Sequence, residues 1–433
     1  MCLKTKAIQW ASKFSVCCCL DSNGYTDVHG RFDCLIAAGA SDVLSVPESG
    51  KAFEALRDVY DTRKNWLFGL LSYDLKNETE ALHSANEDPL GFPVLYFFVP
   101  EYLVGISGND ITVLIGPESI ANDIRRTEVP ATASVSGASL SLTARFSKAD
   151  YLDTVKTLKN HILRGNIYEV TFCQEFYARN AEIDALALYL KLNSISPTPF
   201  SSFFKMESRY ILCASPERYL CKRGKHLYSQ PIKGTAKRST DPVDDHERRE
   251  ALRTSIKERA ENVMIVDLVR NDLTRCAKKG GVCVDELFGL YSFPQVHQLI
   301  STVSCEMEQN LHPVRAIQNT FPMGSMTGAP KISAMELIEQ YERSRRGAYS
   351  GALGYFSPDG DFDFNVIIRS ILYNQQAQYL SFHVGGAITY LSDAEAEYEE
   401  CLLKAKAIKK AISYSISSPQ ANPAEFGQSA PRP

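Results

Sequence analysis

Three strand-like runs joined by very short turns restrict the fold of this chain more than any other feature. The runs cover residues 348–356, 362–373 and 379–384, and the turns between them are Ser-Pro-Asp-Gly at 357–360 and Asn-Gln-Gln at 374–376. Connections this short join neighbouring antiparallel strands, because a parallel connection needs about a dozen residues or more. The sequence therefore predicts an antiparallel sheet in this part of the chain.

Helical patterns alternate with further strand-like runs along the rest of the chain. Ser147 is suited to cap a helix, and Tyr151, Val155 and Leu158 form one apolar face, which predicts a helix that ends at Gly165. Further helices are predicted at 49–62, 184–192, 244–277, 313–319, 332–343 and 393–413. Further strands are predicted at 16–20, 66–73, 93–99, 102–105, 111–115, 167–173, 200–205, 209–214, 218–222, 285–291 and 297–306. This mixture indicates an α+β fold with mostly hairpin connections.

Composition shifts suggest how the chain is divided. Residues 1–125 are predicted to form an N-terminal α+β region, and the Ser-, Thr-, Ala- and Pro-rich segment 122–145 is a candidate linker or crossover. Residues 147–412 carry the motifs described below and are predicted to form the catalytic domain. The Pro-, Ser-, Ala- and Gln-rich tail 417–433 is expected to be disordered.

Composition also excludes several classes of function. The chain has 433 residues and a net charge of −4, so it offers no electrostatic basis for binding nucleic acid or an anionic membrane. The apolar stretch at 14–20 is too short to span a membrane and lacks a cleavage site after it. Its twelve cysteines are scattered without a Cys-x-x-Cys pair, which argues against a zinc site and predicts a reduced, cytoplasmic protein.

Two pairs of glutamates stand on predicted helices. Glu258 and Glu261 are three residues apart, as are Glu397 and Glu400, so each pair lies on one helical face. A solvated face with local ion pairs, for example to Lys257, is one interpretation. The alternative is that two facing helices form an oxygen-rich site for a hard divalent cation such as Mg²⁺, without which the carboxylates would repel one another.

Lys233 is the most ambiguous charged residue in the chain. It lies between Pro231, which stiffens the backbone before it, and Gly234, which can adopt positive φ after it. Locally, Lys233 is either an exposed turn lysine or a positioned amine. Arg369 and Lys404 are candidates to bind a substrate carboxylate. Together these residues describe a site for a small anionic metabolite.

Several long motifs occur in an order that resembles the chorismate-utilising enzymes, a family that includes anthranilate, aminodeoxychorismate, isochorismate and salicylate synthases. The resemblance covers residues 147–412 and is only loose in the N-terminal part. The fold it implies is α+β, with two large antiparallel sheets packed together, helices outside and the active site in a cleft, like anthranilate synthase component I. The motifs are Ser-Pro-Glu-Arg at 215–218, Pro-Ile-Lys-Gly-Thr at 231–235, the stretch 259–273, Thr-Gly-Ala-Pro-Lys at 327–331, Tyr-Ser-Gly-Ala-Leu-Gly-Tyr at 349–355 and Glu-Ala-Glu-Tyr-Glu-Glu at 395–400.

The resemblance implies a Mg²⁺ site. Glu261 and Glu400 would hold the ion, with Glu258 and Glu397 behind them. The ion would in turn bind the ring carboxylate of chorismate.

The resemblance also implies where the rest of the substrate binds. Arg369 and Tyr349 would bind the enolpyruvyl carboxylate. Lys404 and the backbone at Gly385 and Gly386 would complete the anion site.

Three further positions follow from the family motifs. Glu217 would be the general acid for the departing C4 hydroxyl, which requires a raised pKa. Thr327 would contribute to substrate binding. His297 falls where the family usually carries histidine, and is weighed equally between the site and the core.

Lys233 separates the branches of the family. The anthranilate, isochorismate and salicylate branches usually carry alanine here, whereas aminodeoxychorismate synthases usually carry lysine. In that branch the lysine is taken to attack C2 of chorismate while the C4 hydroxyl leaves, and ammonia then adds at C4 and expels it. A neutral amine is required, so burial beside Mg²⁺ is expected to lower the pKa of Lys233 from its usual value of about 10.4.

The resemblance thus implies component I of an aminodeoxychorismate synthase in the folate and 4-aminobenzoate branch. No cysteine lies in a glutaminase-like setting, so ammonia would come from a separate glutamine amidotransferase subunit. Anthranilate synthase component I is the main alternative, followed by isochorismate or salicylate synthase. A non-catalytic binding subunit would be expected to lack Glu217 or a metal glutamate, and all are present.

Overall fold

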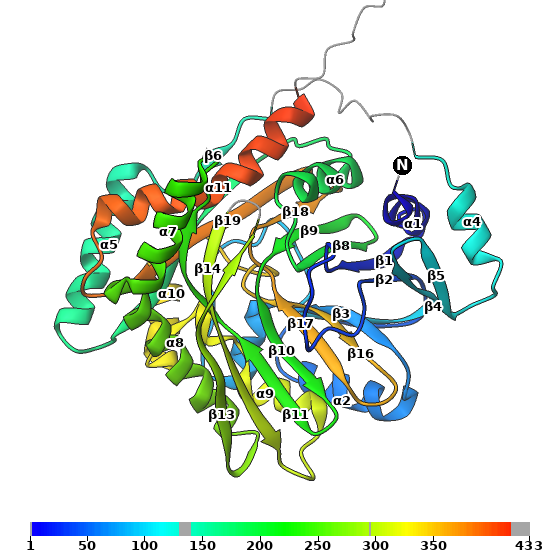
Figure 1. The fold of residues 1–433 in the computed structure, drawn as a ribbon, viewed down its shortest axis with the longest axis horizontal. Helices are drawn as coiled ribbons and strands as arrows, with labels where there is room; N and C mark the ends of the chain where they lie inside the picture. The colour runs from blue at the N-terminus through cyan, green and yellow to red at the C-terminus, as the bar shows by residue number, and fades with distance from the viewer. Residues whose placement is uncertain (1, 130–139, 294–295, 417–433) are drawn as a thin grey trace, which may run out of the picture.

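Strands run through the centre of the molecule, and helices pack around much of its outside, although β11 (His226–Gln230) and β13 (Ala277–Ser292) reach its lower edge (Figure 1). The structure is a computed structural model that describes residues 2–129, 140–293 and 296–416. The mixture of helices and antiparallel strands confirms the α+β class predicted from the sequence. The tail predicted to be disordered, 417–433, lies outside the described residues. Among the described helices, none combines the length and the apolar character needed to cross a membrane.

The strands range from two-residue bridges to a long, curved ribbon. They are β1 (Val16–Asp21), β2 (Cys34–Val46), β3 (Leu67–Leu71), β4 (Leu95–Ser107), β5 (Asp110–Ile115), β6 (Thr143–Ala144), β7 (Glu169–Ala178), β8 (Phe200–Met206), β9 (Arg209–Ser215), β10 (Arg218–Arg223), β11 (His226–Gln230), β12 (Ile232–Lys237), β13 (Ala277–Ser292), β14 (Val296–Met307), β15 (Gly328–Ala329), β16 (Ala352–Phe356), β17 (Phe362–Val366), β18 (Ser370–Asn374) and β19 (Tyr379–Ile388).

The helices lie between these strands in the sequence. They are α1 (Leu3–Ala11), α2 (Ala52–Arg63), α3 (Lys76–Thr79), α4 (Ile120–Arg126), α5 (Lys148–Leu163), α6 (Ala185–Ile195), α7 (Pro242–Thr254), α8 (Ile256–Thr274), α9 (Pro313–Thr320), α10 (Lys331–Tyr341) and α11 (Ala394–Ile416). The helix predicted after Ser147 begins as expected, because the Ser147 hydroxyl accepts a hydrogen bond from the amide of Asp150 at 3.1 Å.

Antiparallel pairing joins the strands into one continuous ladder. Its order is β7, β19, β18, β9, β8, β1, β2, β4, β3, β16, β17, β10, β11 and β14. β12 and β13 pair with β14, and β15 pairs with β7. The two sheets implied by the resemblance are therefore joined edge to edge, with β7 near one end of the ladder and β12 near the other, where β13 is the outermost strand.

Two apolar clusters stabilise this ladder. One is rich in aromatic rings, among which Phe356 lies 5.8 Å from Phe97 and 5.2 Å from Phe364 between ring centroids. The other lies under α5, α6 and α11, where Tyr151 packs on Phe172 of β7 at 5.2 Å. Burial of such large side chains contributes most of the favourable free energy of folding. The second cluster fixes α11 against β19, which carries part of the site.

The segment 244–277, predicted as one helix, is two helices. The break falls at Ser255, whose backbone is extended and whose hydroxyl accepts a hydrogen bond from the amide of Glu258 at 3.3 Å. Ser255 thereby caps the start of α8. The break places Glu258 and Glu261 in the first two turns of a new helix rather than in the middle of a long one.

The segment 362–373, predicted as one strand, is also interrupted. β17 ends at Val366 and β18 begins at Ser370, and Arg369 between them has a positive φ of 52°. Such a φ is uncommon for a residue with a side chain, so it indicates a turned backbone rather than a continuous strand. The interruption occurs at a residue that lines the candidate site.

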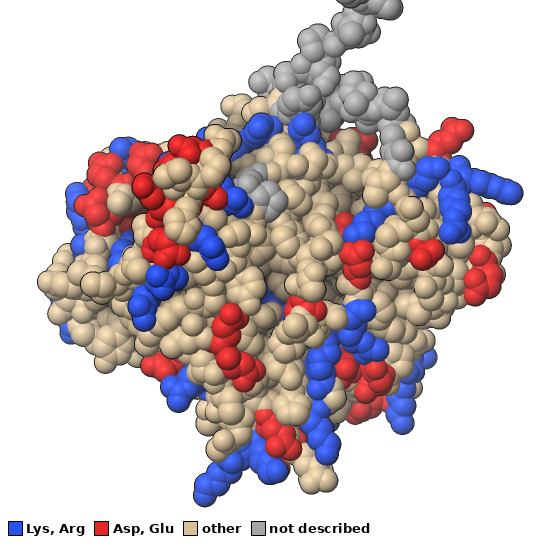
Figure 2. Space-filling model, in the orientation of Figure 1, with Lys and Arg blue, Asp and Glu red and all other residues tan. Residues whose placement is uncertain are grey.

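The N-terminal region is built into the same ladder as the rest of the chain. β1 pairs with β8, and β3 pairs with β16. The sequence did not predict β2 or α1, which complete this region. On the face shown in Figure 2, Lys and Arg side chains lie among Asp and Glu side chains.

Candidate functional site

A cavity of about 150 Å³ lies among α8, α11 and the strands at both ends of the ladder. It brings together most of the site residues predicted from sequence. Those that line it are Glu217, Lys233, Glu258, Glu261, Tyr349, Arg369, Gly385, Gly386, Glu397, Glu400 and Lys404. Thr327 and His297 are not among its lining residues. Residues separated by almost two hundred positions thus share one small space.

Lys233 lies on a strand rather than in an exposed turn. It belongs to β12, whose pairing with β14 shifts in register between Ile232 and Thr235, next to Gly234 with a φ of 93°. This irregularity accompanies a Lys233 side chain that is only 11% exposed. Its Nζ donates a hydrogen bond to Oε1 of Glu169 at 2.5 Å. Of the two local interpretations of Lys233, the structure supports a positioned amine.

Glu169 is a site residue that the sequence did not predict. It is the first residue of β7, and its side chain is 6% exposed. Opposite it, β15 pairs Ala329 with Glu169, and a Cβ on Gly328 would lie 2.2 Å from the Glu169 carbonyl oxygen. Only glycine fits at this distance, so the Thr-Gly-Ala-Pro-Lys motif holds the backbone of Glu169 closely. The available signal was a carboxylate at the start of a predicted strand, and Glu175 on the same strand carries the same signal without lying at the site.

The pKa of Lys233 is raised in the protein without metal or substrate. Burial acts to lower it, but the charges of Glu169 and Glu261 and the hydrogen bond from Glu169 outweigh burial, so the pKa lies above its usual value. The lowering was expected for the protein with Mg²⁺ bound, so it stays a prediction for that state. Without metal or substrate, Lys233 is an ammonium ion.

Glu217 shows the pKa shift that its predicted role requires. It lies between β9 and β10, with its amide donating to the Ser215 hydroxyl at 3.2 Å and its carbonyl accepting from Val366 at 3.0 Å. The residue is 4% exposed, and burial raises its pKa to about 7, against the opposing effects of the Ser325 hydroxyl and the Lys233 charge. A substantial fraction of Glu217 therefore keeps its proton near neutral pH.

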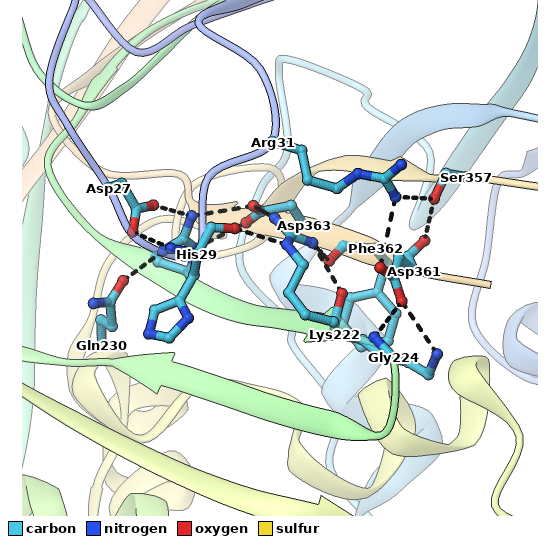
Figure 3. A network of polar contacts seen from close by, with 12 residues as sticks. Asp27, His29, Arg31, Lys222, Gly224, Gln230, Ser357, Asp361, Phe362 and Asp363 are labelled. Carbon is cyan, nitrogen blue, oxygen red and sulfur yellow. Dashed lines mark hydrogen bonds and ion pairs between the residues drawn. The ribbon is translucent and has the colours of Figure 1, made fainter. Parts of the chain in front are cut away.

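An arginine–carboxylate network fixes the strand that follows Glu217 (Figure 3). The Arg218 guanidinium donates to Asp363 at 2.9 Å and to Gln230 at 2.6 Å, and it also pairs with Asp27 of the N-terminal region. Arg223 pairs with the same Asp363. Arg218 is buried, and each of its ion pairs is enclosed, so removing one partner would leave an uncompensated charge. The network ties β10 to β17 and to the N-terminal region directly beside Glu217.

The four predicted metal ligands face the cavity from two helices. Burial raises the pKa of Glu258, of Glu261 to about 7, and of Glu397. The pKa of Glu400 is lowered, first by the charge of Lys404, whose Nζ lies 2.7 Å from Oε1 of Glu400. Clustered carboxylates of this kind bind a proton or a cation more readily than isolated ones.

The donor set fits a hard divalent cation, although no group of three or more metal-binding side chains converges within the described residues. Oε1 of Glu261 is buried and accepts no hydrogen bond. The Lys257 ammonium lies 3.8 Å from Oε1 of Glu261 and 3.6 Å from Oε1 of Glu397, so a positive charge already stands between the two helices. Mg²⁺ usually binds one or two carboxylates together with other oxygens, and these helices offer enough carboxylates for that.

Arg369 and Tyr349 line another side of the cavity. Among the described residues, no ion pair to the Arg369 guanidinium is found, and burial lowers its pKa. Tyr349 stacks on His383 with ring centroids 4.8 Å apart, and its hydroxyl lies 3.4 Å from Sγ of Cys173. A guanidinium without a carboxylate partner in a small cavity is suited to bind an incoming anion.

Lys404 closes the cavity on the α11 side. Its Nζ donates to the carbonyl of Gly385 at 2.8 Å in addition to its contact with Glu400. Gly385 and Gly386 belong to β19, where they pair with Cys173 and Phe172 of β7. Backbone of β19 and a cation of α11 therefore meet at one edge of the site.

His297 and Thr327 have structural contacts instead. The His297 ring contacts the Ser292 hydroxyl at 2.8 Å and Asp245 at 3.1 Å. Its neighbour Gln298 lines the cavity, and Oε1 of Gln298 is buried without a hydrogen-bond partner. Alternation along β14 explains this, because adjacent side chains of a strand point to opposite faces. The Thr327 hydroxyl donates to the Gly324 carbonyl at 3.1 Å and shapes the loop beside β7.

Comparison with known proteins adds to this geometry. A sequence model described as chorismate binding enzyme matches residues 20–410. The probable chloroplastic aminodeoxychorismate synthase of Oryza sativa subsp. japonica is 36% identical over 387 residues, which cover 79% of this chain but 43% of that protein. Aminodeoxychorismate synthase component 1 of Escherichia coli K12 is 34% identical, and the aligned region covers 79% of this chain and 76% of the Escherichia coli protein. Anthranilate synthase component 1 of Cereibacter sphaeroides is 32% identical, and the aligned region covers 80% of this chain and 73% of that protein.

Solved structures share the fold. Anthranilate synthase component I from Streptococcus pneumoniae superposes with a TM-score of 0.76 at 24% identity, covering 89% of this chain and 93% of that one. The menaquinone-specific isochorismate synthase MenF from Escherichia coli superposes with a TM-score of 0.74 at 17% identity, and the superposition covers 94% of this chain and 91% of MenF. These likenesses bear on the architecture alone.

Proposed function

Because the chain belongs to the chorismate-binding enzyme family, we propose that it converts chorismate and ammonia to 4-amino-4-deoxychorismate through a covalent adduct on Lys233. The observation that carries this proposal is the Lys233 amine, which is buried in the cavity that also contains Glu217 and the four glutamates. Several relatives named aminodeoxychorismate synthase, at 34–41% identity, favour the same activity.

The proposed reaction has two displacements. In the first, the Lys233 nitrogen forms a bond to C2 of chorismate while the C4–O bond breaks, and Glu217 gives its proton to the departing hydroxyl, which leaves as water. In the second, ammonia forms a bond to C4 while the C2–N bond to Lys233 breaks. The added nitrogen then returns a proton to Glu217. Chorismate and ammonia are consumed, and the aminated product and water are formed.

We propose that Mg²⁺ is held by Glu261 and Glu400, with Glu258 and Glu397 behind them. When bound, the ion would supply positive charge for the ring carboxylate of chorismate. The orphaned Oε1 of Glu261 and the raised pKa values around it support this assignment. Arg369, with Tyr349 beside it, would bind the enolpyruvyl carboxylate, and Lys404 would add a further cation to the anion site.

The ammonia source and the location are also proposals. We expect a glutamine amidotransferase subunit to deliver ammonia, and we expect the protein to act in the cytoplasm. All twelve cysteines are free, and most of them are buried, which is consistent with a reducing compartment.

The product distinguishes this proposal from the anthranilate alternative. Purified protein would be incubated with chorismate, Mg²⁺ and ammonium, and the products would be followed by fluorescence and chromatography. We expect a product that yields 4-aminobenzoate only after a lyase is added. Direct appearance of fluorescent anthranilate would contradict the proposal and support anthranilate synthase.

A further inference from the structure

We propose that Glu169 holds the Lys233 amine in its attacking position and accepts its proton when the amine attacks the substrate. This inference rests on the proposed function. It assigns a role to a residue that the family motifs used above do not include, and it follows from the contacts of Lys233.

The contact between the two side chains is short and enclosed. Nζ of Lys233 lies 2.5 Å from Oε1 of Glu169, and the side chains are 11% and 6% exposed. Lys233 lines the cavity and Glu169 does not. The carboxylate is therefore not part of the cavity lining that a substrate would contact. A group in this place can act on the amine without contacting the substrate.

Other carboxylates face Lys233 but have different tasks. Glu217, between β9 and β10, must keep its proton for the leaving hydroxyl, and burial supports this by raising its pKa to about 7. Glu258 and Glu261 of α8 and Glu400 of α11 influence Lys233 through charge without an ion-pair contact to it among the described residues. Glu169 of β7 is the carboxylate within hydrogen-bonding distance of Nζ.

The proton balance of the proposed reaction requires such an acceptor. Lys233 begins as an ammonium ion, which has no free electron pair and cannot form a bond to carbon. Transfer of one N–H proton to Glu169 frees that pair, which then forms the bond to C2. When the C2–N bond breaks, the pair returns to the nitrogen and Lys233 recovers its proton from Glu169. Glu169 and Lys233 end in their starting states, so no other reactant is needed.

The first test compares Glu169→Gln with Glu175→Gln. Glu175 lies on the same strand, is also buried, and pairs with Arg145 at 2.7 Å outside the cavity, so it controls for the loss of a buried carboxylate from β7. We expect Glu169→Gln to lower kcat for chorismate consumption by about 10²-fold or more, with KM for chorismate nearly unchanged. Glu175→Gln should leave kcat close to that of the unchanged protein, because Glu175 is not among the residues that line the cavity.

The second test does not depend on which product the protein makes. The rate at which cyanate carbamoylates Lys233 would be measured against pH by mass spectrometry, in the protein without substrate. Only the neutral amine reacts, so removing the negative charge of Glu169 should move the labelling midpoint to lower pH in Glu169→Gln and not in Glu175→Gln. If Glu169→Gln fails to fold, Glu169→Asp, which keeps the charge but shortens the reach, replaces it in the turnover assay and should lower kcat, while Glu169→Ala replaces it in the labelling assay.

The two tests distinguish the contact between Glu169 and Lys233 from the role of Glu169 in the reaction. An unshifted labelling midpoint would overturn the proposal, as would wild-type kcat in Glu169→Gln. A shifted midpoint together with lost turnover supports it. If the wild-type protein aminates no chorismate, the proposed function fails, and the role of Glu169 in the reaction fails with it, whereas a shifted midpoint would still establish the holding contact.

Discussion

At the scale of single residues, Lys233 and Glu217 face one cavity with upward-shifted pKa values that have different causes. Burial raises the pKa of Glu217, whereas Lys233 is kept charged by neighbouring carboxylates in spite of its burial. Before substrate binds, Glu217 can therefore already carry the proton that the proposed reaction needs, whereas Lys233 is still an ammonium ion and not the neutral amine. Activation of the amine must accompany a change in its surroundings, and both Mg²⁺ at Glu261 and proton transfer to Glu169 would provide one.

We expect Lys233→Ala to abolish amination, because the proposed adduct forms on the Lys233 amine. Turnover should fall by about 10³-fold or more, as for loss of a nucleophile. Binding of chorismate and Mg²⁺, measured by calorimetry, should be largely kept. Lys237→Ala, on the exposed end of the same strand, is the matched control and should turn over normally. Undiminished turnover in Lys233→Ala would remove the residue from the mechanism.

The rate should also depend on the proton of Glu217. Because the pKa of Glu217 is about 7 in the protein without substrate and the acid form is required, kcat/KM for chorismate should decline as pH rises through about 7. Glu217→Gln should lose about 10²–10⁴-fold in kcat, which is the usual contribution of a general acid. The measurement is a pH profile of chorismate consumption at substrate concentrations well below KM. A rate that increases steadily through neutral pH would be inconsistent with this assignment.

Sequence reasoning missed Gln298 and Glu169 because their places at the site depend on strand pairing, which local sequence does not specify. Position 297 carries the histidine, but β14 turns that ring toward Asp245 and places Gln298 at the cavity instead. A shift of one position moves a side chain to the other face of a strand. A motif match that ignores strand register can therefore assign the wrong one of two neighbouring residues to the site. Glu169 was overlooked because its importance depends on β12, which is distant in sequence.

At the scale of elements, α8 and α11 supply the carboxylates, and their approach has an energetic cost. The raised pKa values of Glu258, Glu261 and Glu397 mean that ionising them destabilises the folded state relative to the unfolded chain. Lys257 and Lys404 offset part of this cost. A divalent cation would offset more of it.

Thermal stability without metal should therefore fall as pH rises. For Glu261 the stabilising contribution of the raised pKa is fully present below the unfolded value of about 4.5 and is lost as pH passes through about 7. Above that pH, Mg²⁺ should raise Tm and EDTA should reverse the effect, whereas near pH 4.5 Mg²⁺ should change little. Differential scanning calorimetry measures both trends. The Mg²⁺ effect should shrink in Glu261→Gln, and an equal effect there would argue against this ligand.

Local chemistry explains which element boundaries were predictable. α5 was predicted closely because Ser147 caps it and its apolar face is regular. The break before α8 also had a signal, since Ser255 and Glu258 form the Ser-x-x-Glu pattern of a helix start, but strong helix formers on both sides concealed it. The interruption at Arg369 had no comparable signal, because nothing local to an apolar strand predicts a positive φ at arginine.

At the scale of the whole molecule, the antiparallel class could be predicted from short turns, but the strand order could not. Hairpins such as β18–β19 follow from local sequence. Pairs such as β1–β8 and β3–β16 join segments far apart in the chain, and no local pattern specifies them. The predicted separation into 1–125 and 147–412 followed the extent of the family resemblance and the composition of the segment between them, whereas strand pairing runs through both regions.

A fragment of residues 147–412 should consequently not fold by itself. It would expose the edges of β8 and β16 and would leave Arg218 without Asp27. We expect the full chain to give a cooperative thermal transition by circular dichroism and the fragment to give none. Adding the separate N-terminal region to the fragment serves as the control. A cooperative transition of the fragment alone would show that 147–412 is an independent domain.

The ion pair between Lys233 and Glu169 joins β12, which pairs with β14 near one end of the strand ladder, to β7 near the other. The two side chains can meet only where these distant parts of the ladder lie side by side. In a partly folded chain that keeps β7 and β12 apart, Lys233 would lack this carboxylate, so its pKa should return toward the ordinary value for lysine. The protonation of one side chain therefore reports on long-range assembly.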